Sequence, residues 1–153
     1  MSQIEIQRVF ESEGQPDQAQ IQTWIDAALE DVDQDFEIVV RIVDETESAQ
    51  LNEQYRHKKG PTNILSFPFE VPDGFELNLL GDLVICAPVV AREADEQGKM
   101  PGHHWAHIIV HGVLHLLGYD HIDDDEAEQM ESKEMEILKK LDINNPYTEV
   151  IEA

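Results

Sequence analysis

Basic side chains are scarce in this sequence. Lysine and arginine together number 10, against 33 aspartate and glutamate residues, and the formal net charge is −23. Such a surface repels polyanions at long range, although salt screens the repulsion beyond ~8 Å at physiological ionic strength. Any binding of nucleic acid must therefore depend on a local concentration of positive charge. The acidity itself is more typical of solubility, or of a salty cytoplasm, than of a binding function.

Cysteine is nearly absent as well. Cys86 stands alone, which excludes an internal disulfide, and we expect it to be a small buried thiol in an apolar strand. No stretch approaches the ~20 apolar residues of a membrane span. The N-terminus lacks the basic and apolar regions of a secretory signal. These absences favour a cytoplasmic protein, and the length of 153 residues predicts one domain over 1–153.

Hydrophobic periodicity predicts four strands and five helices. The strands are predicted over residues 3–10, 36–43, 63–67 and 83–86, and the helices over 17–32, 46–56, 88–97, 103–117 and 124–141. Residues 71–80 show no period and are predicted to form a loop. Pro68 places the third strand at a sheet edge, because proline cannot donate a ladder hydrogen bond. The order predicts an α+β fold, with a small mixed sheet of about four strands packed against about five helices. Helix N-caps are offered by Asp17, by Asp44 or Thr46, and by Asp123.

Three histidines near the end of the fourth predicted helix have the spacing of metal ligands. His111 and His115 are four residues apart, so on a helix they project from one face, ~5–6 Å apart at Cβ. Gly118 can end that helix in a left-handed conformation, so that the chain turns back and His121 completes the site. Three protein ligands leave a fourth position for water, as in catalytic zinc sites. The pattern predicts Zn²⁺ at His111, His115 and His121, although histidine also suits nickel, copper or iron.

The spacing H-x-x-x-H-x-x-G-x-x-H matches the metzincin peptidases, whose pattern is H-E-x-x-H-x-x-G-x-x-H. A metzincin-like metal helix is therefore expected. Gly112 stands where those peptidases carry the glutamate that acts as general base. This difference argues against peptidase chemistry and leaves the proton acceptor unassigned.

The same stretch, with Tyr119 and Asp120 before the last histidine, closely resembles the YbeY family, metal-dependent endoribonucleases of bacterial ribosomal RNA maturation. The resemblance extends to residues 55–58 (YRHK), 61–70 (PTNILSFPFE) and 80–86 (LGDLVIC). It implies the same α+β fold and zinc-dependent cleavage of single-stranded RNA, at the 3′ end of small-subunit ribosomal RNA and in ribosome quality control. It also implies precursor ribosomal RNA as substrate, with ribosomal proteins of the small subunit or an assembly GTPase as partners.

Arg56 resembles the arginine that this family places over its metal site. A guanidinium can donate two parallel hydrogen bonds to phosphate oxygens and stays charged, so Arg56 is expected to clamp the scissile phosphate. Lys58 and Lys59 add positive charge for substrate binding. Asp120 either orients a ligand through its second ring nitrogen or shapes the turn. The expected catalytic residues are Arg56, His111 and Asp120, and the proton acceptor is a metal hydroxide, Asp120 or the RNA 2′-hydroxyl pathway.

The other four histidines are not expected to be metal ligands. His107 lies one turn before His111 on the same face and could compete as a ligand, but a fourth imidazole would close the open position. His103 and His104 are expected at the surface, at the helix start, and His57 is left undecided. Four further residues match the family blocks and are expected only in turns and strand ends: Thr62, Asn63, Ser66 and Asp82.

Two other interpretations stay open. One is a zinc hydrolase of another class, a peptidase or amidase, which the metzincin-like spacing supports and the missing glutamate and secretory signal oppose. The other is a non-catalytic ribosome-assembly factor in which a metal only holds the last two helices together. The low local basic charge supports that second interpretation.

Overall fold

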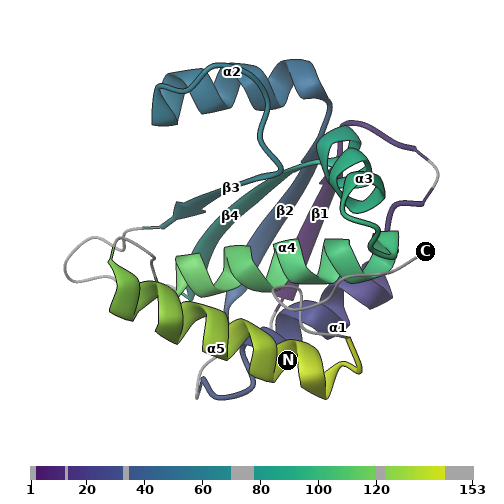
Figure 1. The fold of residues 1–153 in the computed structure, drawn as a ribbon. Coiled ribbons are helices and arrows are strands. Elements are labelled where there is room, and N and C mark those ends of the chain that lie inside the picture. Colours follow the sequence, from purple (N-terminus) through teal and green to yellow (C-terminus); the bar gives the residue numbers. More distant parts are fainter. Residues whose placement is uncertain (1–2, 13, 33–34, 70–77, 120–122, 144–153) are drawn as a thin grey trace.

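The computed structural model describes residues 3–12, 14–32, 35–69, 78–119 and 123–143. Within these ranges the predicted α+β fold is confirmed (Figure 1). Several boundaries differ from the prediction. The first strand ends at Arg8 rather than at residue 10, the first helix ends at Ala28 rather than at residue 32, and the fourth helix begins at Pro101 rather than at residue 103. The fourth strand already includes Leu79 and Leu80, which were predicted to be loop. The elements are, in order, β1 (Gln3–Arg8), α1 (Gln18–Ala28), β2 (Glu37–Val43), α2 (Glu45–Arg56), β3 (Ile64–Pro68), β4 (Leu79–Cys86), α3 (Ala87–Glu96), α4 (Pro101–Leu116) and α5 (Asp124–Lys140).

The sheet is mixed and has the strand order β1-β2-β4-β3. β2 pairs in parallel with β1 and with β4, whereas β3 pairs antiparallel with β4. Parallel neighbours need a crossover connection, and α1 supplies it between β1 and β2. β3 lies at the sheet edge and ends at Pro68, as the missing proline N–H predicted.

Helices cover the sheet on both sides. Figure 1 shows α1, α4 and α5 along one side and α2 on the other. The larger core cluster joins α1, α4 and α5 to the sheet and includes Ile25, Val40 and Leu114, which are fully buried. A smaller cluster lies on the α2 side and includes Leu65 and Cys86. The β3 edge is therefore bordered by helices above and below.

Local sequence fixes where the helices begin and where α4 ends. Aspartate side chains accept a hydrogen bond from the third backbone N–H in α1, α2 and α5, at distances of 2.8, 2.9 and 2.8 Å. The caps are the predicted Asp17, Asp44 and Asp123, with Asp44 rather than Thr46 capping α2. After α4, Gly118 has φ +103°, and the N–H groups of Gly118 and Tyr119 return to the carbonyls of His115 and Leu114. Such 5→2 and 6→1 bonds form a Schellman turn, which needs a positive φ at that glycine.

The predicted apolar core is confirmed, and among the described residues four polar side chains are buried as well, namely Ser48, Asn52, His104 and Glu134. Cys86 is fully buried, and burial raises the pKa of its thiol. His104, expected at the surface, is only 3% exposed, so that prediction was wrong. Glu134, on the inward face of α5, is fully buried. None of the helices within the described ranges is long and apolar enough to cross a membrane.

Candidate functional site

Two histidine rings converge at the C-terminal end of α4. His111 and His115 stand one turn apart on one helix face, as their spacing predicted. The Nε2 atoms of the two rings are 3.0 Å apart, and the ring centroids are 4.6 Å apart. Two imidazoles bound tetrahedrally to one zinc ion, with bonds of roughly 2.0–2.1 Å, would hold their nitrogens about 3.3 Å apart. The pair therefore fits two ligands of a single ion.

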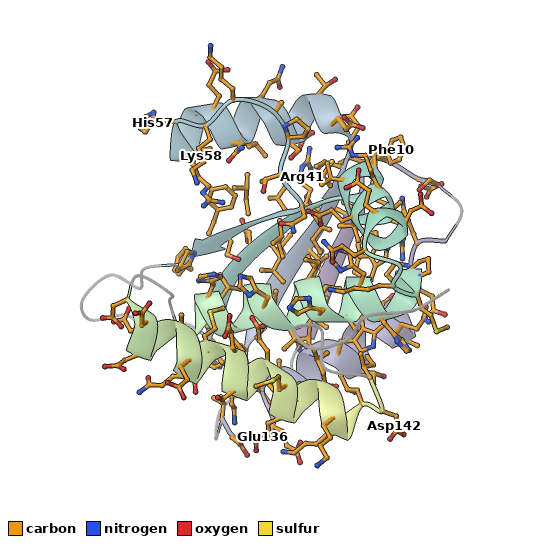
Figure 2. All side chains as sticks on the ribbon, in the orientation of Figure 1. Phe10, Arg41, His57, Lys58, Glu136 and Asp142 are labelled. Carbon is orange, nitrogen blue, oxygen red and sulfur yellow. The ribbon has the colours of Figure 1, made fainter. Side chains whose placement is uncertain are left out.

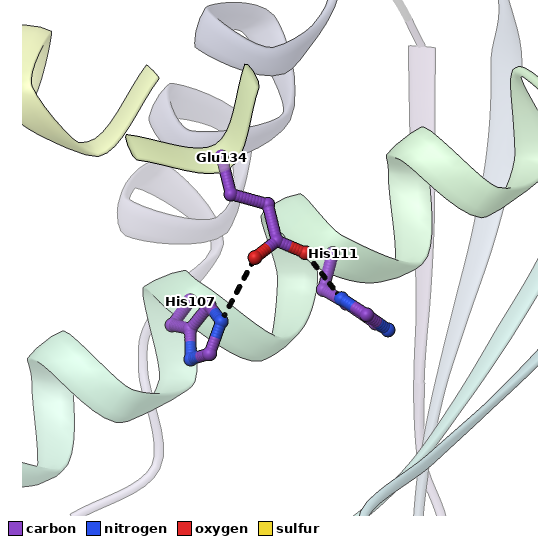
Figure 3. A group of neighbouring side chains, drawn as sticks. All are labelled: His107, His111 and Glu134. Atoms are coloured by element: carbon purple, nitrogen blue, oxygen red, sulfur yellow. Dashed lines mark hydrogen bonds and ion pairs between the residues drawn. The ribbon is translucent and has the colours of Figure 1, made fainter. Parts of the chain in front are cut away.

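A buried carboxylate holds the other side of His111. Glu134 reaches from α5 and lies between two rings of α4 (Figure 3). His111 donates from Nδ1 to Oε1, and His107 donates from Nε2 to Oε2 at 3.3 Å. Glu134 has no exposed surface. Burial lowers the pKa of His107, while the hydrogen bond to Glu134 opposes that shift.

Within the described part of the chain, two groupings could take part in metal binding. His107, His111 and Glu134 each offer a ligand atom, and these atoms lie within 4.8 Å of one another, so the three could hold a metal ion. Alternatively, His111 uses Nε2 together with His115, and Glu134 fixes the ring through Nδ1. A carboxylate on the second nitrogen is the usual partner of a metal-bound histidine. Both residues of the second grouping, His111 and His115, border an open cleft, whereas of the first grouping only His111 does.

The cleft has a volume of about 710 Å³ and runs along the β3 edge. In Figure 1, β3 lies between α2 and the C-terminal end of α4. Arg56, the last residue of α2, lines this cleft together with His111 and His115. The structure thus brings together residues that are 55 positions apart in the sequence. The full lining is Tyr55, Arg56, Asn63, Ile64, Leu65, Ser66, Phe67, Pro68, His111, His115, Gly118 and Tyr119.

Positive charge gathers at the C-terminal end of α2. Arg56, Lys58 and Lys59 are exposed, and within the described ranges no carboxylate forms an ion pair with any of them. Lys58, which is labelled in Figure 2, and Lys59 follow the helix, and neither of them lines the cleft. Four other basic residues pair with carboxylates: Arg41, Arg92, Lys133 and Lys140. Three exposed basic residues without a carboxylate partner in the described ranges therefore lie at the helix end that borders the cleft.

Gly112 faces the sheet rather than the cleft. A Cβ atom at this position would lie 2.6 Å from Ile64 Cδ1 and 2.8 Å from Leu83 Cδ2. Contacts that short require the ends of these two side chains to shift, so α4 packs closely against the sheet at a residue that has no side chain. A glutamate at this position would point into the interface between helix and sheet and not into the cleft.

The remaining predicted residues are divided between the cleft and the scaffold. Asn63 and Ser66 line the cleft, and the Asn63 amide donates to Glu93 Oε1 at 3.0 Å. His57 is exposed and ends α2 with φ 57°. Thr62 donates its backbone N–H to Ser48, and Asp82 lies in β4. The predicted ligand His121 and its neighbour Asp120 lie outside the described residues.

Two contributions were missed by sequence reasoning. Glu134 follows Met130 by four residues and precedes Leu138 by four, so it stands on the apolar face of α5. A single carboxylate on an apolar helix face indicates that the carboxylate accepts hydrogen bonds from buried donors. His104 sits inward because its Nε2 bonds Glu93 Oε1 at 3.0 Å, and only the packing of α3 against α4 reveals that partner.

Comparison with known proteins gives consistent matches. The family model described as endoribonuclease YbeY matches residues 5–142. A protein named endoribonuclease YbeY from Colwellia psychrerythraea is 59% identical over 138 residues, covering 88% of this chain and 89% of that protein. One of the same name from Alteromonas mediterranea is 55% identical over 150 residues, covering 94% and 95%. The solution structure of TM1509 from Thermotoga maritima has a TM-score of 0.58 at 22% identity, covers 97% and 99% of the two chains, and supports the fold alone.

Proposed function

The chain belongs to the endoribonuclease YbeY family, and from this membership we propose that it is a metal-dependent endoribonuclease that cleaves single-stranded RNA. The observation that carries the proposal is the shared cleft, which Arg56, His111 and His115 line together. A guanidinium beside a pair of converging imidazoles is suited to a phosphodiester. The arginine binds the phosphate, and the imidazoles hold a divalent ion next to it.

His111, His115 and His121 are proposed as the ligands, with Zn²⁺ as the ion. Imidazole nitrogens suit zinc, and the 3.0 Å separation of the His111 and His115 Nε2 atoms fits one tetrahedral ion. When bound, zinc supplies a Lewis acid and makes hydroxide available near neutral pH. The proposed ligand set leaves out His107, because its Nε2 forms a hydrogen bond with Glu134.

Arg56 neutralises the phosphate and stabilises the charge that builds up on its oxygens. Glu134 is a positioning residue: its carboxylate fixes the tautomer of His111 with the proton on Nδ1, so that Nε2 keeps its lone pair for the ion. Asp120, beside the third ligand, is proposed to hold a ligand ring or to accept a proton. Lys58 and Lys59, which follow α2 beside the cleft, are proposed to bind neighbouring phosphates of the strand.

The substrate is proposed to be precursor ribosomal RNA, at the 3′ end of the small-subunit RNA and in defective ribosomes. Work on such RNA places the protein in the cytoplasm. Ribosomal proteins of the small subunit, or an assembly GTPase, are the proposed partners, and basic ribosomal proteins complement a net charge of −23. The peptidase alternative loses support, because residue 112 is a glycine and any side chain there would point at the sheet, so this position supplies no general base to the cleft.

The test is cleavage of a single-stranded RNA by purified protein, with and without a chelator and with zinc restored. We expect cleavage to stop with the chelator, to return with zinc, and to be lost in His111→Ala. Arg56→Ala should lower the rate about 10²–10³-fold, and Arg56→Lys should recover part of it. Undiminished cleavage by metal-free His111→Ala protein would overturn the proposal.

The non-catalytic alternative makes the opposite prediction for Arg56. If a metal only ties α4 to α5, Arg56→Ala should leave function intact, while metal removal lowers the melting temperature. A stable Arg56→Ala protein that no longer cleaves RNA would contradict that alternative.

A further inference from the structure

Tyr55 presents an aromatic ring to the cleft that the proposed metal chemistry does not use. It precedes Arg56 in the last turn of α2 and lines the same cleft. The residue is 56% exposed. Single exposed apolar residues are common on protein surfaces, so exposure alone does not indicate a binding site. The contacts that hold the Tyr55 ring are the stronger evidence.

The Tyr55 ring is held in place by Phe67 of β3. Their centroids are 5.1 Å apart, with an interplanar angle of 72°, which is an edge-to-face contact. Phe67 in turn packs against the smaller core cluster around Leu65 and Val84. An edge-to-face pair engages the edge of one ring, so aromatic surface is left for a second partner. Tyr55 is thus an exposed ring on a rigid support.

Charge indicates the chemistry of that partner. Arg56 is the next residue, and Lys58 and Lys59 follow within four positions, without carboxylate partners in the described ranges. A ligand on Tyr55 therefore combines a flat apolar group with negative charge beside it. In a nucleic acid every base carries a π face and every base is next to a phosphate.

We propose that Tyr55 forms a nucleobase subsite, on which one base of single-stranded RNA stacks beside the phosphate that Arg56 binds. The inference rests on the proposed function and deepens it, since it assigns the preference for single strands to a residue. A base inside a duplex is stacked and paired, so it cannot lie on a side chain, whereas an unpaired base can. Stacking on a π face tolerates any base, so Tyr55 contributes strand selectivity with little sequence preference.

The experiment measures binding of a fluorescent, 2′-O-methylated single-stranded oligonucleotide to the metal-loaded protein by anisotropy, with oligonucleotide integrity checked on a gel. Stacking of one base is expected to make Tyr55→Ala bind about 5- to 150-fold more weakly. Tyr55→Phe keeps the ring and should bind as the wild type does. Phe69→Ala is the matched control: this aromatic residue is 43% exposed but lies outside the cleft, and its replacement should change affinity less than twofold.

A second measurement leaves the protein unchanged. An oligonucleotide with one base removed at the bound position should lose the same affinity with the wild-type protein, and should lose nothing further with Tyr55→Ala. Equal binding by Tyr55→Ala and wild type, in a protein that still cleaves RNA, would overturn the subsite and leave the proposed function standing. A wild-type protein that neither binds nor cleaves RNA would overturn both.

Discussion

Glu134→Gln removes a buried charge from between two imidazoles while keeping the shape of the side chain. The carboxylate accepts from His111 Nδ1 and from His107 Nε2 and has no exposed surface. Hydrogen bonds to an ionised acceptor contribute about 1.5–3 kcal/mol each. An amide can accept from only one of the two rings and must donate to the other. Both rings then lose their charged partner, and the ring that faces the amide NH2, either His107 or His111, must change tautomer to accept.

The loss of the carboxylate in Glu134→Gln should lower both the metal affinity and the stability of the fold. Losing the carboxylate on the second nitrogen of a metal-bound histidine weakens metal affinity about 10–100-fold, or about 1.4–2.7 kcal/mol. Competition with a chromophoric chelator measures this loss. Without metal, the stability of the fold should fall by about 1–3 kcal/mol, because one strong hydrogen bond is replaced by a weaker one. Urea unfolding of metal-free protein measures that change.

Glu131→Gln is the matched control, because Glu131 is an exposed glutamate on the same helix. Its replacement should change neither quantity. Unchanged metal affinity in Glu134→Gln would refute the positioning role. If Glu134 is itself a ligand, with His107 and His111, its replacement should lower affinity more than about 10³-fold, and His115→Ala should leave affinity nearly intact. The two variants together therefore decide which grouping binds the ion.

Three further predictions concern the scaffold around the cleft. Gly112→Ala should destabilise the protein by about 1–3 kcal/mol in urea unfolding, because its Cβ would overlap two strand side chains. The control is Gly102→Ala, whose Cβ would have nothing within 4 Å and which should be neutral or slightly stabilising. Equal effects of the two substitutions would contradict the close packing of α4. Burial would raise the pKa of Glu93, but hydrogen bonds from His104 and Asn63 outweigh burial and leave the pKa below 4.5. The stability that Glu93 contributes is therefore present above pH 4.5 and is lost as the pH falls through the lower pKa of the folded state. Glu93→Gln should make stability depend less on pH in this acidic interval, and an unaltered pH profile would contradict the linkage. The Cys86 thiol, buried and with a raised pKa, should react with a disulfide reagent only after denaturation, and rapid labelling of native protein would contradict its burial.

The elements were predictable because their signals are local. The aspartate caps, the apolar stripe of α4 and the glycine of its Schellman turn each act within a few residues, and Pro68 identifies an edge strand by chemistry alone. The pairing of His111 with His115 follows from helix geometry and was also within reach. Leu79 and Leu80 were missed because strand pairing with β2, rather than an alternating pattern, decides where β4 begins.

The cleft itself depends on contacts between distant segments. No spacing relates Arg56 to His111, and only the position of β3 between α2 and α4 brings them to one cleft. Glu134 could be recognised as a carboxylate on an apolar helix face, but its partners come from another helix. His104 was misjudged for the same reason, since Glu93 supplies its partner from α3. Predictions failed where burial is decided by a residue on another element.

The charge distribution makes the proposed RNA cleft compatible with a strongly acidic chain. A net charge of −23 repels RNA from most directions, but screening limits that repulsion to about 8 Å at physiological ionic strength. Inside this distance the residues in contact with the RNA determine whether it is attracted or repelled. The positive charges of Arg56, Lys58 and Lys59 lie at the end of α2 that borders the cleft. The proposed RNA contact therefore lies beside a local concentration of positive charge on an otherwise strongly acidic chain. The acidic surface lowers non-specific binding and so favours the single productive orientation, in which a phosphate lies on Arg56.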